Sequence, residues 1–218
     1  MKHNRIAFTL AEVLITLGII GVVTALTIPT LIANHQKEVV GTRLKKFYSS
    51  FNQAIQMSVA ENGDFSTWHL DTQDNATNEK WVQEYIIKYM QVVETKDFLF
   101  GHTKMYYLAD GSAFARNNDT NTRDWVYFTQ EPQKCIQHNS QPAPSFGAVK
   151  EPLGRCAFEF SLSSTKGMTP YTYGWQDNNI ETLKQGCKSD IRDKRLWCTK
   201  VIQLNDWKIP KDYPWKVY

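Results

Sequence analysis

An apolar run near the N-terminus, from Phe8 to Ala33, constrains this chain more than any other feature. As an α-helix it would extend about 39 Å at 1.5 Å per residue, enough to cross a hydrocarbon core about 30 Å thick. Lys2 and Arg5 precede it with no acidic residue between them. By the positive-inside rule these charges predict a cytoplasmic leader at residues 1–7 and an exported chain after the run.

One carboxylate, Glu12, lies inside the run. A charge at the bilayer centre costs about 2.5 to 3.5 kcal/mol on insertion scales, and less near an end, so this residue needs a partner and indicates a function. A plain membrane anchor explains the length of the run but leaves Glu12 unexplained. A secretory signal peptide has a shorter apolar stretch and a small-residue cleavage site, and the run ends at residues 27–30 without such a site.

A short basic leader ending in Ala7, followed by Phe-Thr-Leu-Ala-Glu at 8–12 and a long apolar segment, resembles the class III signal of type IV pilins and type II secretion pseudopilins. The resemblance implies that a prepilin peptidase cuts between Ala7 and Phe8 and methylates the new amine of Phe8. It also implies that Glu12 meets the N-terminal amine of a neighbouring subunit during assembly. Most members have glycine before the cut; alanine is small enough for a site that selects against bulk.

The pattern changes along the predicted helix. Apolar side chains surround the first half, which suits lipid and then a filament core of packed helices. Pro29 cannot donate a hydrogen bond to Ala25, so we predict a kink there; the alternative is that Pro29 ends the span. The pattern ends at residues 61–64, so one helix is predicted from about Thr9 to Ala60. Its second half has a stripe that should pack on a globular domain: Val40, Leu44, Phe47, Phe51, Ile55 and Ser58.

The membrane or filament-core helix is thus assigned to residues 8–33 and an exported globular domain to residues 34–218. The resemblance and the patterning together predict an α+β, pilin-like fold, in which the long helix packs on an antiparallel sheet. A short extra helix is expected from about Asn78 to Val93, because aromatic residues recur there every four positions. Strands are expected at Met105–Leu108 and Ala113–Arg116, around an Asp-Gly turn, and at Trp125–Thr129, Ala157–Leu162 and Leu196–Leu204.

Four cysteines lie on the predicted exported side, and an even number there favours disulfides. Of the three possible pairings we favour Cys135 with Cys156 and Cys187 with Cys198, because both close local loops. No pair has the Cys-x-x-Cys spacing that zinc sites usually have. The second loop would bound a C-terminal region, whose last segment, with Trp207, Ile209 and Trp215, is expected to be strapped onto the sheet; the alternative is an exposed contact surface.

The charge balance argues against a general nucleic-acid binder. Without Lys2, Arg5 and Glu12 the chain has 23 basic and 21 acidic residues, from totals of 25 and 22. Basic residues are nevertheless concentrated within and beside the second cysteine loop. Either this is a solvated loop, or it is a patch that binds DNA or another acidic ligand. The candidate patch consists of Lys184, Lys188, Arg192, Lys194, Arg195 and Lys200.

No catalytic constellation is evident, because the five histidines are scattered and no nucleophile motif accompanies them. We therefore expect no enzyme and no cofactor. Calcium is a candidate ion at two clusters of oxygen-bearing side chains, Asn-Asn-Asp at 117–119 and Asp-Asn-Asn at 177–179. Both clusters lack the alternating ligands and closing glutamate of a calcium loop, so ordinary turns are the favoured interpretation.

The resemblance implies a structural subunit of a type IV pilus or a type II secretion pseudopilus. Such a subunit is stored in the inner membrane, with its N-terminus cytoplasmic and its C-terminal domain periplasmic, until it joins a filament. Its partners would be other pilin or pseudopilin subunits, the prepilin peptidase and the inner-membrane assembly platform. The alternative is a membrane-tethered periplasmic binding domain or enzyme that does not assemble into filaments.

Overall fold

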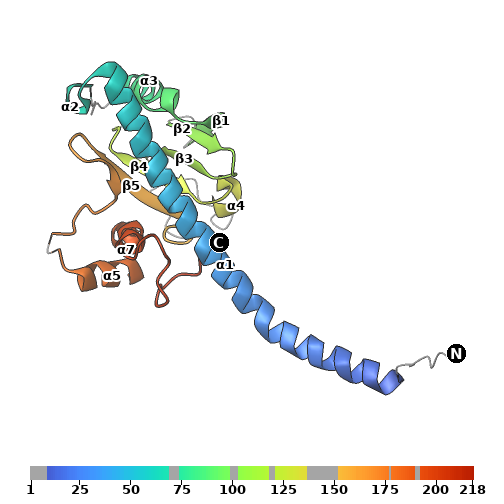
Figure 1. Ribbon diagram of the computed structural model, residues 1–218. Coiled ribbons are helices and arrows are strands. Elements are labelled where there is room, and N and C mark those ends of the chain that lie inside the picture. Colours follow the sequence, from blue (N-terminus) through green and yellow to red (C-terminus); the bar gives the residue numbers. More distant parts are fainter. Residues whose placement is uncertain are drawn as a thin grey trace. The chain divides into compact units, whose positions relative to one another are not determined.

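The computed structural model (Figure 1) describes residues 9–68, 74–98, 103–117, 121–136, 152–176, 178–189 and 192–218. The chain divides into two compact units, Met1–Gln36 and Lys37–Tyr218. One helix, α1 (Leu10–Asn62), belongs to both. Its first part makes up nearly all that is described of the first unit, and its second part is an element of the second unit.

The predicted single helix is confirmed, and it ends two residues beyond the expected position. Pro29 lies inside α1, so the helix does not end there. The kink remains a prediction. At the C-terminal end Gly63 has a φ of +84° and its amide donates to the Val59 carbonyl at 3.0 Å. Glycine suits this left-handed position, which explains why the helix stops at the predicted Asn-Gly.

The predicted stripe on the second half of α1 is buried in full. Phe47 lies at its centre, stacked on Tyr127 with ring centroids 4.2 Å apart and in contact with the rings of Phe114 and Phe160 at 5.3 and 5.1 Å. Phe51 adds an edge contact to Trp125 at 5.1 Å. Because the four partners come from three successive strands, the helix is fixed across the middle of the sheet (Figure 1).

The sheet has six antiparallel strands whose spatial order equals their order in the chain. Tight turns at 109–112 and 164–166 connect β2 to β3 and β5 to β6, whereas the connection from β4 to β5 is long and includes a helix. The predicted antiparallel sheet is therefore confirmed. The strands are β1 (Val92–Phe98), β2 (Thr103–Leu108), β3 (Ala113–Arg116), β4 (Asp124–Phe128), β5 (Ala157–Ser163) and β6 (Gly167–Pro170).

The central strands are buried on both faces, because alternate residues join different clusters. Trp125 and Tyr127 of β4 join the core beneath α1, whereas Val126 and Phe128 join a second cluster on the other face. The second cluster includes the cysteines of one disulfide, Cys135 and Cys156. Helix α4 (Pro132–Ile136) and the turn at 152–156 cover that face, so the strand residues form continuous apolar runs.

Two predicted elements are wrong. The strand expected at Leu196–Leu204 is replaced by the helix α7 (Cys198–Leu204), which follows the short helix α6 (Arg192–Arg195). Cys198, Val201 and Ile202 are all buried, and this spacing of three and four is that of a helix, which the β-branched residues obscured. The shorter helices α2 (Phe65–Trp68) and α5 (Ile180–Lys188) and the strand β6 were not anticipated.

The helix expected from Asn78 to Val93 is also incorrect at both ends. Helix α3 spans Asn75–Tyr85 and a 3-10 turn, η1, follows at Ile87–Tyr89. Val93 belongs to the strand β1. The side chain of Asp74 accepts a hydrogen bond from the Thr77 amide at 2.8 Å, so a polar cap sets the start.

Candidate functional site

The first part of α1 is the most unusual surface of the chain. It is long and apolar enough to span a membrane by length and composition, and its apolar window is not buried against any described part of the structure. An ordinary globular surface seldom leaves such a continuous apolar area uncovered. The large exposed apolar side chains here are Leu10, Val13, Leu14, Ile15, Leu17, Ile19, Ile20, Val22, Val23, Leu26, Ile28, Leu31 and Ile32.

Glu12 has a local partner at the start of this helix. Its Oε2 accepts hydrogen bonds from the amide and the hydroxyl of Thr9, both at 2.8 Å, and its own amide donates to the Thr9 hydroxyl at 3.3 Å. This reciprocal arrangement is a capping box, with Thr9 at the N-cap and Glu12 at the third helical position. The signature Thr-x-x-Glu before an apolar run was readable in the sequence, and it gives Glu12 a role within one subunit.

The predicted cleavage pair, Ala7 and Phe8, lies outside the described residues. The Glu12 carboxylate is four positions after Phe8 in the chain, at the first turn of α1. A carboxylate there is also favoured by the positive end of the helix dipole. The structure thus places Glu12 in the first turn of the helix.

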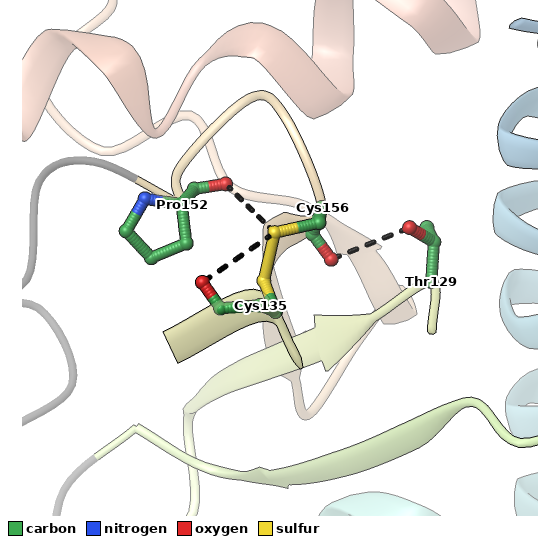
Figure 2. The surroundings of a disulfide bond; sticks show 4 residues. All are labelled: Thr129, Cys135, Pro152 and Cys156. Atoms are coloured by element: carbon green, nitrogen blue, oxygen red, sulfur yellow. Dashed lines mark hydrogen bonds between the residues drawn. A yellow bond between two sulfur atoms is a disulfide. The ribbon is translucent and has the colours of Figure 1, made fainter. Parts of the chain in front are cut away.

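Both predicted disulfides are confirmed. Cys135 of α4 is bonded to Cys156, with Cα atoms 6.0 Å apart (Figure 2). The Cys156 sulfur lies 3.9 Å from the Pro152 carbonyl oxygen and 4.0 Å from that of Cys135; a disulfide sulfur has no proton, so these are contacts. The Cys156 carbonyl accepts from the amide and the hydroxyl of Thr129, at 2.9 and 3.3 Å. The bridge therefore attaches α4 to the sheet.

The second disulfide joins the C-terminal helices. Cys187 at the end of α5 is bonded to Cys198 at the start of α7 (Figure 1 draws both helices in orange and red). The Trp215 indole donates to the Cys187 carbonyl at 2.8 Å, so the last segment of the chain is held against the bridge. The predicted disulfide-bounded C-terminal region is thus present.

The C-terminal segment is a strap, but its ring and hydrogen-bond contacts join it to α1, to the turn at 152–156 and to α5, where the sheet was expected. Trp207 is buried, and Ile209 and Trp215 are partly buried against the main core. Tyr213 was not singled out by the sequence, yet it is buried and its hydroxyl donates to the Gly154 carbonyl at 2.7 Å. Burial raises the pKa of this hydroxyl, which therefore remains a donor at any ordinary pH.

The candidate basic patch is only partly a surface. Lys188 and Lys194 are exposed, and Lys184 is one helical turn from Lys188 on α5. Lys200 is partly buried and donates to Gln203 at 2.7 Å; burial, and then the nearby Lys166, lower its pKa. The side chain of Arg192 lies outside the described residues.

Arg195 is not available to a ligand. It is 2% exposed, and its guanidinium carbon lies 3.6 Å from the centre of the Trp215 ring, a cation–π contact. Arg155 approaches the same ring at 5.2 Å. Arg195 thus packs against the Trp215 ring of the C-terminal segment. The sequence could not show this contact, because Arg195 and Trp215 are not neighbours in the chain.

A buried charged network that was not predicted joins α3 to the sheet. Arg116 of β3 is 1% exposed and pairs with Glu79 at 3.3 Å and with the Asn75 side chain at 2.6 Å. The Tyr106 hydroxyl also donates to Glu79. Burial, and then the Glu79 charge, raise the pKa of Tyr106, so this network is a fixed set of donors and acceptors with a structural role.

The described residues of the two calcium candidates bind groups of the protein itself. The Asn117 amide donates to Glu159 at 3.1 Å, and the Asn179 side chain accepts from the Glu181 amide at 2.9 Å, capping α5. Residues 118, 119 and 177 are not among the described ones. Within the described ranges, no group of three His, Cys, Asp or Glu side chains could hold a metal ion.

A family of unknown function, DUF6613, has a model that matches residues 30–217. No curated protein and no solved structure matches the chain. The matched range contains the globular unit up to its last residue but one, with both disulfides, and it begins after Glu12 and most of the exposed apolar surface. The match covers most of the sequence, and the chain therefore belongs to the DUF6613 family.

Proposed function

We propose that this chain is a structural subunit of a type IV pilus or of a type II secretion pseudopilus. The observation that supports this most is the exposed apolar surface of α1 from Leu10 to Ile32, on a helix that begins with the pilin-like motif. Lipid covers this surface while the precursor is stored in the inner membrane. The same side chains of neighbouring subunits then cover it in the filament core, without any change in the globular unit.

Processing comes first in this proposal. The prepilin peptidase removes residues 1–7 and methylates the amine of Phe8, which places a positive charge four residues from Glu12 in the chain. In an apolar core the attraction between opposite charges is weakly screened, so the amine of one subunit and the Glu12 carboxylate of another pair as the second subunit docks. The pairing fixes the register between subunits. The periplasmic globular unit and its two disulfides then form the outer layer.

The first test is mass spectrometry of the native N-terminus. We expect the chain to begin with a methylated Phe8. An intact Met1 in the membrane-bound protein would overturn the pilin assignment, because the family's assembly depends on the new amine.

The capping box provides a sharper test. Glu12→Gln removes the charge but retains a side chain that can close the capping box. Thr9→Ala does the reverse, because it removes the hydroxyl of the box and leaves the carboxylate. We expect Glu12→Gln to abolish or strongly reduce filament formation and Thr9→Ala to reduce it far less, with both proteins inserted and folded. The opposite ranking would mean that Glu12 serves only as a cap.

The capping box is also the observation that favours a second candidate function. If Glu12 only caps α1, a plain anchor explains the first unit, and the globular unit is a tethered periplasmic domain. This alternative predicts a free membrane monomer that keeps its leader and is insensitive to Glu12→Gln.

A further inference from the structure

We propose that a pocket at the start of the globular unit binds the zwitterionic headgroup of a phospholipid, through both its phosphate and its primary ammonium group. The pocket has a volume of about 460 Å³, within the usual range for ligand sites. It lies between the Lys37–Lys45 part of α1 and the turn at 206–209. Its lining is made of Lys37, Glu38, Gly41, Thr42, Lys45, Asp206, Trp207, Lys208 and Ile209.

The position of the pocket along α1 favours a membrane lipid over a free solute. Lys37 and Glu38 follow the end of the apolar run at Ala33 by four and five residues, a rise of about 6 to 8 Å. The headgroup layer on each side of the hydrocarbon core is about 5 to 8 Å thick. A helix whose apolar run fills the core therefore carries these two charges at the level of the headgroups.

The charges of the lining match a headgroup with both signs. The lining contains three cationic side chains, Lys37, Lys45 and Lys208, and two anionic ones, Glu38 and Asp206. Because both signs are present, the pocket does not suit a purely anionic ligand. Within the described part of the chain, Lys45 and Asp206 pair at 3.4 Å, both more than half exposed, and Lys37, Glu38 and Lys208 have no ion-pair partner. An exposed pair of this kind contributes about 0 to 1 kcal/mol, so it can rearrange around a ligand at little cost.

The wall formed by the C-terminal turn is rigidly placed. Gly41 lets the Trp207 carbonyl approach so closely that a Cβ at position 41 would lie 2.1 Å from its oxygen. Asp206 and Trp207 both have positive φ, 52° and 61°, and the Trp207 amide donates to the Ile202 carbonyl at 2.9 Å. The Trp207 ring is buried and packs on Tyr48 with centroids 5.0 Å apart. The pocket is therefore preformed, and a strained turn of non-glycine residues is held in place to form it.

In this arrangement the Lys37 and Lys208 ammonium groups bind the phosphate, together with the Thr42 hydroxyl, and the Glu38 and Asp206 carboxylates bind the ammonium group. Charge-assisted hydrogen bonds of these kinds are the strong ones at a partly exposed site. The inference rests on the membrane-stored state of the proposed function and requires no filament. Lipid binding would hold the globular unit at the membrane surface until assembly.

The test is native mass spectrometry of the full chain, released from detergent micelles after titration with dioleoyl phosphatidylethanolamine, phosphatidylglycerol or phosphatidylcholine. We expect one phosphatidylethanolamine to be retained, in preference to the other two. The double variant Lys37→Gln with Lys208→Gln should weaken retention about tenfold, which corresponds to about 1.4 kcal/mol. The control, Lys211→Gln with Lys216→Gln, changes two exposed lysines outside the pocket and should retain lipid as the wild type does.

Three results would overturn the inference. If both double variants lose lipid retention to the same extent, the lipid is held by unspecific charge attraction. If the three lipids are retained equally, no headgroup is recognised. Displacement of the lipid by inorganic phosphate at the same concentration would show a site for free anions. A single variant, Glu38→Gln, provides a second criterion, because it should abolish the preference for phosphatidylethanolamine over phosphatidylglycerol while leaving the fold intact. Filament formation is not measured, so failure here and failure of the pilus proposal are separate results.

Discussion

Leu14 and Leu17 of α1 are each 61% exposed, whereas Leu44 and Phe51, further along the same helix, are fully buried. The two parts of α1 therefore differ in environment and not in secondary structure. The second part finds its apolar partner within the chain, in the aromatic rings of the sheet. The first part has no such partner in the described residues, and in the proposed function its apolar area is covered by lipid or by the helices of other subunits.

The largest effect is expected for Phe47→Ala. This change removes four ring contacts at the centre of the core and should lower the free energy of unfolding by about 3 to 5 kcal/mol. The control in the other part of the helix is Leu17→Ala, which should change it by less than about 0.5 kcal/mol. Denaturant unfolding of the full chain in detergent, followed by near-UV circular dichroism, gives both values. Similar losses would mean that the two parts are packed alike.

Glycines on the same helix offer a second comparison. Gly41→Ala forces the Trp207 carbonyl away and should cost about 1 to 3 kcal/mol, as overpacking does. A Cβ added at Gly21 would meet no described atom within 4 Å, so Gly21→Ala should be neutral or raise helix stability by up to about 1 kcal/mol. Thermal melting of the two variants measures the difference. If Gly41→Ala melts no lower than Gly21→Ala, the turn at Trp207 is not docked on α1.

A polar contact on the second part of α1 gives a third test. The Asn52 amide donates to the Met168 carbonyl at 3.0 Å and its oxygen accepts from the Met168 amide at 3.0 Å, so it pairs with the edge strand β6 as another strand would. Asn52→Asp removes the donor and should cost about 1 to 3 kcal/mol. Gln53→Glu makes the same chemical change at an exposed neighbour and should cost little. Equal costs in denaturant unfolding would rule out this pairing.

The smallest effect concerns pH. Burial acts to raise the pKa of Asp110, but hydrogen bonds from Ser112 and the ion pair with Lys46 of α1 outweigh it, so the pKa is lowered on folding. A lowered pKa stabilises the fold fully above the unfolded value of about 3.9, and this contribution is lost as the pH falls through the folded value. Asp110→Asn should therefore cost about 1 kcal/mol or less at pH 7.

The measurement is the difference in unfolding free energy between wild type and Asp110→Asn at a series of pH values. The difference should be constant near neutrality and disappear in acid. Asp212→Asn serves as the control, because it removes one carboxylate at an exposed position where the described part of the structure shows no ion pair. A difference for Asp110→Asn that persists unchanged below about pH 3 would contradict the assignment.

Much of the fold could be predicted because its signals are local. The helix stop at Asn62 and Gly63, the hairpin at Asp110 and Gly111 and the buried stripe on α1 each depend on a few neighbouring residues. The pairing of the cysteines followed from short loops. The errors arose where signals compete. Val201 and Ile202 are β-branched residues that favour a strand, yet the buried residues recur at helical spacing and this segment forms α7. The edge strands β1 and β6 were missed because β1 has no regular alternation of apolar and polar residues and β6 is short.

The sequence by itself determined the apolar helix, its lone carboxylate and the number of disulfides, because composition and spacing within one segment are enough to specify them. Only the tertiary structure decided that Arg195 supports Trp215 instead of the surface, and that Gly41 admits the C-terminal turn and so forms a pocket. Both depend on atoms brought together from distant positions in the chain. Their free energies come from packing and desolvation, which no local pattern encodes.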